Sequence, residues 1–259
     1  QPRVGIVHID GVLVTKAGPF SDGVVSSQFL TERIESLAAD SRTKAVILDI
    51  NSPGGSGVAS DEVASAVQGT EKPVIAVIRE SGASGAYWIA SAADVIYANR
   101  LSTVGSIGVR ASYLDFSDFI EDYNVTYQRF VAGDHKDFGS PFRSPTENES
   151  ARFQGMLDDL HEIFIAAVAS GRNLSIEHVR GLADGFIYTG GQALELGLVD
   201  VIGGRDDAID ALEEEFGPLQ VVEYQEERSW LSALGGFLSI DPPALAFPEQ
   251  ATPRLVIMT

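Results

Sequence analysis

Residues 72–93 read KPVIAVIRESGASGAYWIASAA and constrain the fold more than any other stretch of the chain. The run Pro73–Ile78 predicts a buried strand, because apolar residues that follow one another without alternation are typical of a strand covered on both faces. The apolar run Tyr87–Ala93 predicts a helix. The small residues between the two runs, with Ser84 among them, therefore predict a strand-to-helix turn.

Similar apolar runs lie on either side of this stretch, with helix-like segments between them. We expect strands at Val4–Ile9, Ala45–Ile50, Val74–Ile78 and Val95–Ala98, and helices at Val24–Ala39 and Ser60–Val67. Strands and helices in alternation predict a mostly parallel sheet built from right-handed crossovers. The expected fold class is therefore α/β.

The second half of the chain has a helix-rich pattern. Apolar residues at three- and four-residue spacings predict a long amphipathic helix at Glu147–Arg172. We expect shorter helices at Ile176–Leu182, Gly191–Leu198 and Asp206–Phe216, and a strand at Val125–Val131.

This pattern predicts a single domain over residues 1–240. The α/β core would span about 3–135 and a helical extension about 140–216. Residues 241–259 contain four prolines, which is too many for regular secondary structure, and predict an extended C-terminal tail.

Composition excludes several classes of function. The net charge is −19, from 37 acidic and 18 basic residues, so most of the surface would repel a nucleic acid. The absence of cysteine removes thiol nucleophiles, thiolate metal sites and disulfides. The four histidines lack a paired metal spacing, and no nucleotide-binding glycine motif occurs, so we expect neither a metal nor a cofactor. No stretch approaches the roughly 18 apolar residues of a membrane span.

Two glycine-rich turns carry the candidate chemistry. Ser84 would present its hydroxyl at a helix N-terminus, where backbone donors favour developing negative charge, although taken alone it is more readily explained as a simple N-cap. The turn 51–57, NSPGGSG, would point backbone N–H groups inward as an oxyanion hole requires, or would serve only as a tight turn. Both turns follow carboxyl ends of expected parallel strands, where ligand sites of α/β sheets gather, so they can face one crevice.

A serine nucleophile needs a base, and the chain offers few. Of the four lysines, Lys136 lies in an irregular stretch, with His135 beside it as a rival. Isolated lysines are usually solvated surface groups. A lysine acts as a base only when its amine is uncharged, which requires burial or nearby positive charge. The residues by themselves leave this choice open.

Five motifs, in this order along the chain, resemble the signal peptide peptidase A (SppA) family. They are NSPGG at 51–55, GASGAYWIA at 82–90, TVGSIGV at 103–109, KD with SPFR at 136–143, and ALELGLVD at 193–200. The resemblance covers most of residues 3–215. It implies an α/β spiral of the Clp protease/crotonase type and a serine endopeptidase that degrades remnant signal peptides or other unfolded, membrane-released peptides.

Carried over residue by residue, the resemblance implies a Ser-Lys dyad. Ser84 would be the nucleophile and Lys136 the general base, with Ser106 as the residue that orients the lysine. The backbone N–H groups of Gly55 and Gly85 would form the oxyanion hole. Such a dyad needs no metal and no cofactor.

The resemblance also implies an assembly and a location. Short members of the family resemble a dome-shaped octameric ring in which the serine of one subunit meets the lysine of its neighbour. The expected partners are therefore peptide substrates and further copies of the chain. A membrane anchor preceding Gln1 would place the catalytic domain outside the cytoplasm, in the periplasm or at the outer face of the plasma membrane.

Other functions remain open at this point. Phage capsid-assembly peptidases resemble the same family and would cleave scaffold protein in the cytoplasm. A crotonase-like acyl-CoA hydratase or isomerase would share the fold and the oxyanion hole but would use a carboxylate base. A catalytically idle scaffold would have lost one dyad member, whereas Ser84 and Lys136 are both present.

Overall fold

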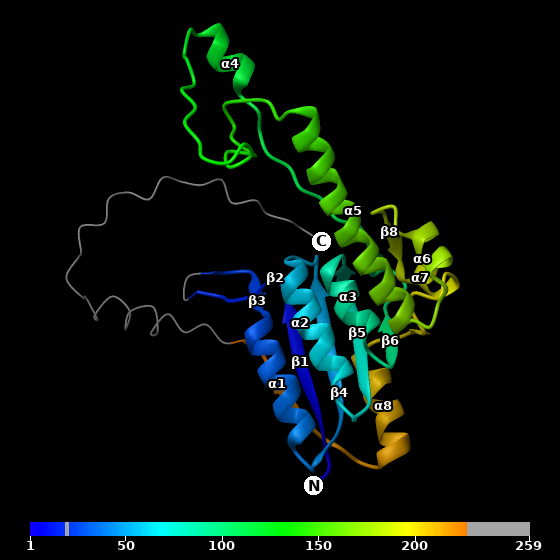
Figure 1. The fold of residues 1–259 in the computed structure, drawn as a ribbon. Coiled ribbons are helices and arrows are strands. Elements are labelled where there is room, and N and C mark those ends of the chain that lie inside the picture. Colours follow the sequence, from blue (N-terminus) through cyan, green and yellow to red (C-terminus); the bar gives the residue numbers. More distant parts are fainter. Residues whose placement is uncertain (19–20, 227–259) are drawn as a thin grey trace, which may run out of the picture.

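The structure is a computed structural model that describes residues 1–18 and 21–226 (Figure 1). The expected tail at 241–259, and the last residues of the expected domain, lie outside the described residues. Among the helices that are described, none combines the length and the apolarity that crossing a bilayer requires.

An eight-stranded, mostly parallel sheet forms the centre of the fold. Six strands lie in the order β10-β1-β4-β5-β6-β9, and every pairing in that order is parallel. Their bounds are β1 Arg3–Asp10, β4 Thr43–Ser52, β5 Val74–Ala83, β6 Val95–Ala98, β9 Val201–Ile202 and β10 Gln220–Tyr224. The expected α/β class is confirmed.

Four short strands lie off this path. Strand β7 (Thr103–Gly105) pairs in parallel with the end of β5, and β8 (Ile187–Thr189) pairs antiparallel with β7. Strands β2 (Val12–Val14) and β3 (Val24–Ser26) form a separate parallel pair. Strand β5 therefore exchanges its partner β6 for β7 as it nears its carboxyl end.

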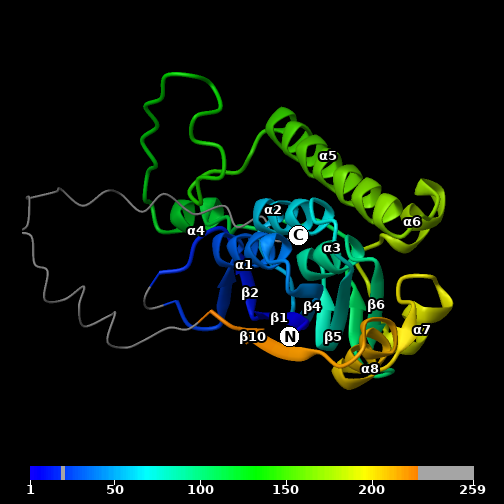
Figure 2. The same cartoon turned by 90° about the horizontal axis from the view of Figure 1, so that it is seen from below.

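Helices cover both faces of the sheet (Figure 2). Helices α1, α2 and α3 lie on one face with α5 outside them, and α8 lies on the other face. The helix bounds are α1 Ser27–Ala39, α2 Gly57–Gln68, α3 Gly85–Ser91, α4 Ser117–Asp122, α5 Glu147–Gly171, α6 Ile176–Leu182, α7 Gly190–Glu195 and α8 Arg205–Phe216. Stacking of Trp88 on Phe164, with ring centroids 4.9 Å apart, joins α3 to α5.

The uninterrupted apolar runs of the sequence follow from this double covering. Successive side chains of a strand point to opposite faces, so Val4 and Ile6 of β1 pack in the core on the side of α8. Val7 and Ile9 pack in the larger core beneath α1–α3. Each fully buried side chain of this kind contributes about 1.5–3 kcal/mol, which is why both faces of the strand are apolar.

One long segment stands away from these layers. Residues 111–146, called the arm here, extend beyond the end of the sheet and contain only the short helix α4 (Figure 1). The strand expected at Val125–Val131 is wrong: the segment is exposed and pairs with no strand in the part of the chain that the structure describes. Its branched residues favour extended backbone, but no strand of the sheet reaches the arm to pair with it.

Candidate active site

Ser84 occupies the strand-to-helix turn that the sequence predicts. Strand β5 ends at Ala83, α3 begins at Gly85, and Ser84 between them has φ 55° and ψ −128°. A residue other than glycine in such a conformation carries strain of order 1–3 kcal/mol, which the surroundings must offset. Here the Ser84 N–H donates to the Gly105 carbonyl at 2.7 Å. This hydrogen bond helps to hold the serine at the N-terminus of α3.

The hydroxyl of Ser84 does not cap the helix. An N-cap serine would accept a hydrogen bond from an N–H of the first turn. Ser84 makes no such bond, although Ser26 and Ser56 cap α1 and α2 in this way. Its side chain is left available for another purpose, which removes the simple N-cap explanation.

The second glycine turn lies directly against Ser84. A methyl group on Gly54 would stand 2.8 Å from the Ser84 Cβ and from the Gly85 nitrogen, and Gly54 has φ 97°. Only glycine permits this approach and this conformation. Hydrogen bonds to Leu13 of β2 on both sides of Gly55 hold the turn, from the Leu13 N–H to the Gly54 carbonyl at 2.9 Å and from the Ser56 N–H to the Leu13 carbonyl at 2.8 Å. The two turns therefore face one crevice, as their positions after parallel strands predict.

Ser106 completes this cluster of small residues. It follows β7 in a left-handed conformation, with φ 54°. Its N–H donates to the Phe186 carbonyl at 2.8 Å, and its hydroxyl donates to the Gly185 carbonyl at 3.4 Å. The hydrogen bond from the Ser84 N–H to the Gly105 carbonyl ties Ser84 to the residue that precedes Ser106.

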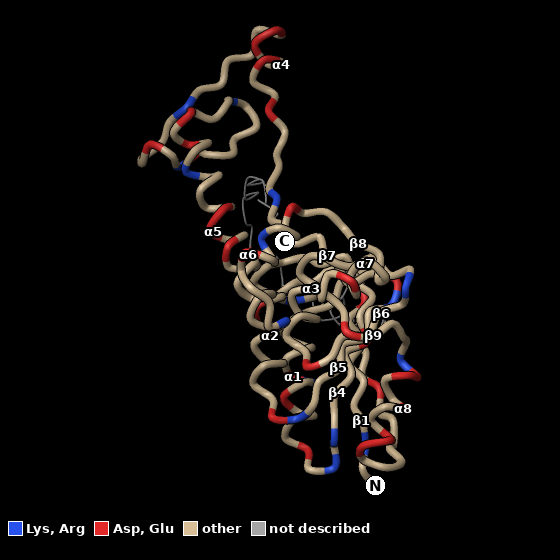
Figure 3. Tube along the Cα trace, turned by 90° about the vertical axis from the view of Figure 1, so that its right-hand side faces the viewer, with Lys and Arg blue, Asp and Glu red and all other residues tan. Residues whose placement is uncertain are grey.

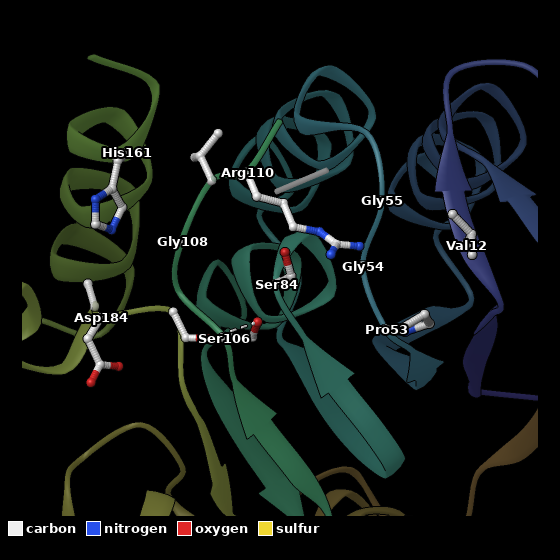
Figure 4. A pocket seen from close by; sticks show the side chains of 13 residues that line it. Val12, Pro53, Gly54, Gly55, Ser84, Ser106, Gly108, Arg110, His161 and Asp184 are labelled. Atoms are coloured by element: carbon white, nitrogen blue, oxygen red, sulfur yellow. Dashed lines mark hydrogen bonds between the residues drawn. The ribbon is translucent and has the colours of Figure 1, made fainter. Parts of the chain in front are cut away.

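These residues open onto a pocket of about 750 Å³ (Figure 4). It is lined by Val12, Pro53, Gly54, Gly55, Ser84, Ser106, Gly108, Val109, Arg110, His161, Ala183, Asp184 and Gly185. Figure 4 shows the Arg110 side chain reaching across the pocket above Ser84 toward Gly54 and Gly55.

Three polar residues of the pocket, Arg110, His161 and Asp184, are absent from the sequence-based candidates. Arg110 directly follows the TVGSIGV motif at 103–109, and this adjacency is a sequence signal that Arg110 lies near the site. His161 lies three residues before Phe164, on the apolar face of a predicted helix, where a histidine is unexpected. Asp184 gave no comparable signal in the sequence.

His161 and Asp184 share the pocket with Ser84 but do not form a triad with it. Within the described residues, no hydrogen bond joins any two of them, and the His161 Nε2 is buried without a partner. A serine-histidine-aspartate mechanism requires both bonds to orient the imidazole. The geometry therefore does not support His161 as the general base.

The two bases considered from the sequence lie on the arm, outside the pocket. Lys136 is exposed, and His135 pairs with Glu149 through its Nδ1 at 3.2 Å. Within one chain, the structure brings together Ser84, Ser106 and the two glycine turns. It does not bring Lys136 to them.

Comparison with known proteins identifies relatives of this chain. The model of peptidase family S49 matches residues 66–217. A candidate signal peptide peptidase SppA from Enterococcus faecium is 38% identical over 87% of this chain and 69% of its own length. A candidate protease from Methanocaldococcus jannaschii is 35% identical over 85% of this chain and 73% of its own length. The chloroplastic serine protease SPPA of Arabidopsis thaliana is 29% identical over 81% of this chain and 32% of its own length.

The fold and these matches define the class of protein, a serine protease with the Clp protease/crotonase type of α/β fold. The chain belongs to peptidase family S49. This membership leaves the acyl-CoA hydratase or isomerase interpretation without support.

Proposed function

We propose that the chain is an endopeptidase that cleaves unfolded peptides, among them remnant signal peptides, with Ser84 as nucleophile and Lys136 as general base. The observation that carries the proposal is the strained, uncapped Ser84 at the floor of the pocket, with the glycine turn 53–55 against it. A serine held in this way at a helix N-terminus is the arrangement that hydrolases use.

The proposed roles define a reaction sequence. The uncharged amine of Lys136 takes the proton of the Ser84 hydroxyl as the oxygen attacks the scissile carbonyl carbon. The resulting oxyanion accepts hydrogen bonds from the N–H groups of Gly55 and Gly85. The lysine then gives its proton to the leaving amine as the C–N bond breaks, and water hydrolyses the acyl-enzyme. Ser106 orients the lysine amine.

The base would come from a neighbouring copy of the chain. The arm carries Lys136 away from the pocket of its own chain, which favours a site shared between subunits. The arm also exposes large apolar side chains, with Phe130 89%, Leu114 71% and Tyr123 69% exposed. Exposed apolar surface of this kind is typical of protein interfaces. We propose a closed homo-oligomer, an octameric ring as the resemblance implies.

An enclosed ring of this kind selects its substrates by access. A folded domain does not enter a cavity shared between subunits, whereas an extended peptide does. We place the activity outside the cytoplasm, at the membrane face where cleaved signal peptides are released. The supply of such peptides, rich in small and apolar side chains, agrees with this substrate class.

A panel of fluorogenic peptides tests the proposed activity. We expect hydrolysis of peptides with small or apolar residues before the cut, and no cleavage of a folded globular protein under the same conditions. The reason is that only an unfolded chain can lay its carbonyl against Ser84. Cleavage would be followed by fluorescence and by mass spectrometry of the products. Equal cleavage of folded and unfolded substrates would contradict the proposal, as would inactivity on every peptide.

The pH profile tests the chemistry of the base. Because a lysine amine accepts a proton only when uncharged, we expect kcat/KM to increase from about pH 6 toward about pH 10. Initial rates on one good peptide, measured at constant ionic strength, give the profile. A matched stability measurement at each pH separates catalysis from unfolding. A flat profile across this range would exclude the lysine as the base.

A further inference from the structure

An ionic network surrounds Lys136 on the arm. The Arg129 guanidinium donates to both carboxylate oxygens of Asp137, at 2.7 and 2.9 Å. Arg143 donates to the same two oxygens, at 2.8 and 2.9 Å. Figure 3 shows basic and acidic residues close together in the segment that precedes α5. The residue next to Lys136 is therefore bound by two arginines.

Arg143 extends the network to the long helix. Its guanidinium also donates to the two carboxylate oxygens of Glu149, at 2.7 and 2.9 Å. Glu149 lies in the first turn of α5, is 4% exposed, and forms a capping box with Thr146. Through this one side chain, the loop that carries Lys136 is tied to the rigid beginning of α5.

The remaining neighbours of Lys136 are held as well. The His135 ring bonds to Glu149, and the Phe138 ring packs against Tyr113 and Phe153 with centroids 6.3 and 5.0 Å away. By contrast, the Lys136 side chain forms no hydrogen bond or ion pair with any described residue. Its neighbours on both sides are fixed, and the amine itself is left available.

The network persists at every pH at which a lysine can act as a base. Hydrogen bonds from Arg143 are the main cause that holds the pKa of the Asp137 and Glu149 carboxyls far below their usual range. Both carboxyls therefore remain charged at neutral and alkaline pH. Bidentate bonds from a guanidinium to a carboxylate are also among the strongest and most directional that side chains form.

We propose that Arg143 is a positioning residue for catalysis: by binding Asp137 and Glu149 at once, it holds the loop of Lys136 in the geometry that delivers the amine to Ser84. This inference rests on the proposed function. A base on a segment without regular secondary structure needs such support, because a displacement of about 1 Å costs orders of magnitude in rate.

Three variants at two residues of the network test this role. Arg143→Ala should reduce kcat about 10- to 100-fold with KM within about threefold of the wild type, as for residues that support a catalytic group. Arg143→Lys should recover part of kcat, because it restores the charge but not the bidentate geometry. Glu149→Gln should also lower kcat while it preserves the capping box, which accepts Gln as well as Glu. Steady-state peptide hydrolysis by the full chain gives both constants.

Controls separate positioning from a loss of structure. Arg180→Ala removes an exposed pair with Glu162 on α5, 2.6 Å long, and should leave kcat unchanged. Circular dichroism and light scattering establish folding and assembly of each variant. If Arg143→Ala does not fold, the kcat of Glu149→Gln serves as the test of the positioning role. A folded Arg143→Ala variant with wild-type kcat overturns the inference. If Arg143→Ala is unfolded, wild-type kcat in Glu149→Gln overturns it.

A Lys136→Ala variant distinguishes this inference from the proposed function. Inactive Lys136→Ala beside fully active Arg143→Ala would overturn the positioning role alone. Active Lys136→Ala would overturn the dyad, and the positioning role with it. The double variant Arg143→Ala/Glu149→Gln should cost little more than Arg143→Ala, because the two residues act as one unit.

Discussion

Ser84→Ala should abolish peptide hydrolysis, lowering kcat/KM by at least about 10⁴-fold, as removal of an attacking hydroxyl does in other serine peptidases. The substitution removes one oxygen from a residue whose side chain does not cap α3. Folding should therefore be retained, and peptide affinity should change little. Steady-state kinetics measures the loss of activity. Mass spectrometry after treatment with a phosphonate, which labels a reactive serine, measures the loss of the reactive oxygen.

Ser81→Ala is the matched control for this variant. Ser81 lies three residues earlier on β5, outside the pocket, and its hydroxyl has no hydrogen bond within the described residues. It should keep wild-type kinetics and label normally at Ser84. Hydrolysis that survives in Ser84→Ala, or labelling that moves to another residue, would refute the assignment of the nucleophile.

Lys136→Ala should lower kcat/KM by at least about 100-fold, since a general base contributes about 10²–10⁴-fold. Mixed assemblies then test whether the base comes from the neighbour. In a ring built from equal amounts of Ser84→Ala and Lys136→Ala chains, one site in four combines an intact serine with an intact lysine, so about one quarter of the wild-type activity should return. Co-expression of the two chains with different tags, followed by tandem purification, provides such rings.

Two further variants complete this experiment. Ser84→Ala mixed with the double variant Ser84→Ala/Lys136→Ala should remain inactive, because no intact serine is present. His161→Gln tests the histidine that lines the pocket as an alternative base, and this variant should retain activity. If rings of confirmed mixed composition that contain Ser84→Ala and Lys136→Ala chains regain no activity, sharing of the site between subunits is contradicted. Loss of activity in His161→Gln with survival in Lys136→Ala would make the histidine the base.

The central layers of the fold could be predicted because their signals are local. Apolar runs such as Val4–Ile9 and Val95–Ala98 mark strands buried on both faces, and the structure places strands at both. The long helix expected at Glu147–Arg172 appears as α5, which ends one residue earlier. Periodicity and capping residues set these bounds within the chain itself. The strand expected at Val125–Val131 failed because a strand also requires a partner, which local sequence does not specify.

In the candidate site, too, some features follow from the local sequence and others only from the tertiary structure. The sequence by itself determined the family motifs, the serine between β5 and α3, and the glycines that allow close backbone approach. Only the tertiary structure decided that Gly54 lies against Ser84, that His161 and Arg110 face the pocket, and that Lys136 stands on an arm outside it. The physical reason is that motifs record which backbone conformations and side chains are present, whereas distances between segments depend on packing of the whole chain. For Lys136, the relevant packing extends to a neighbouring copy in the assembly we propose.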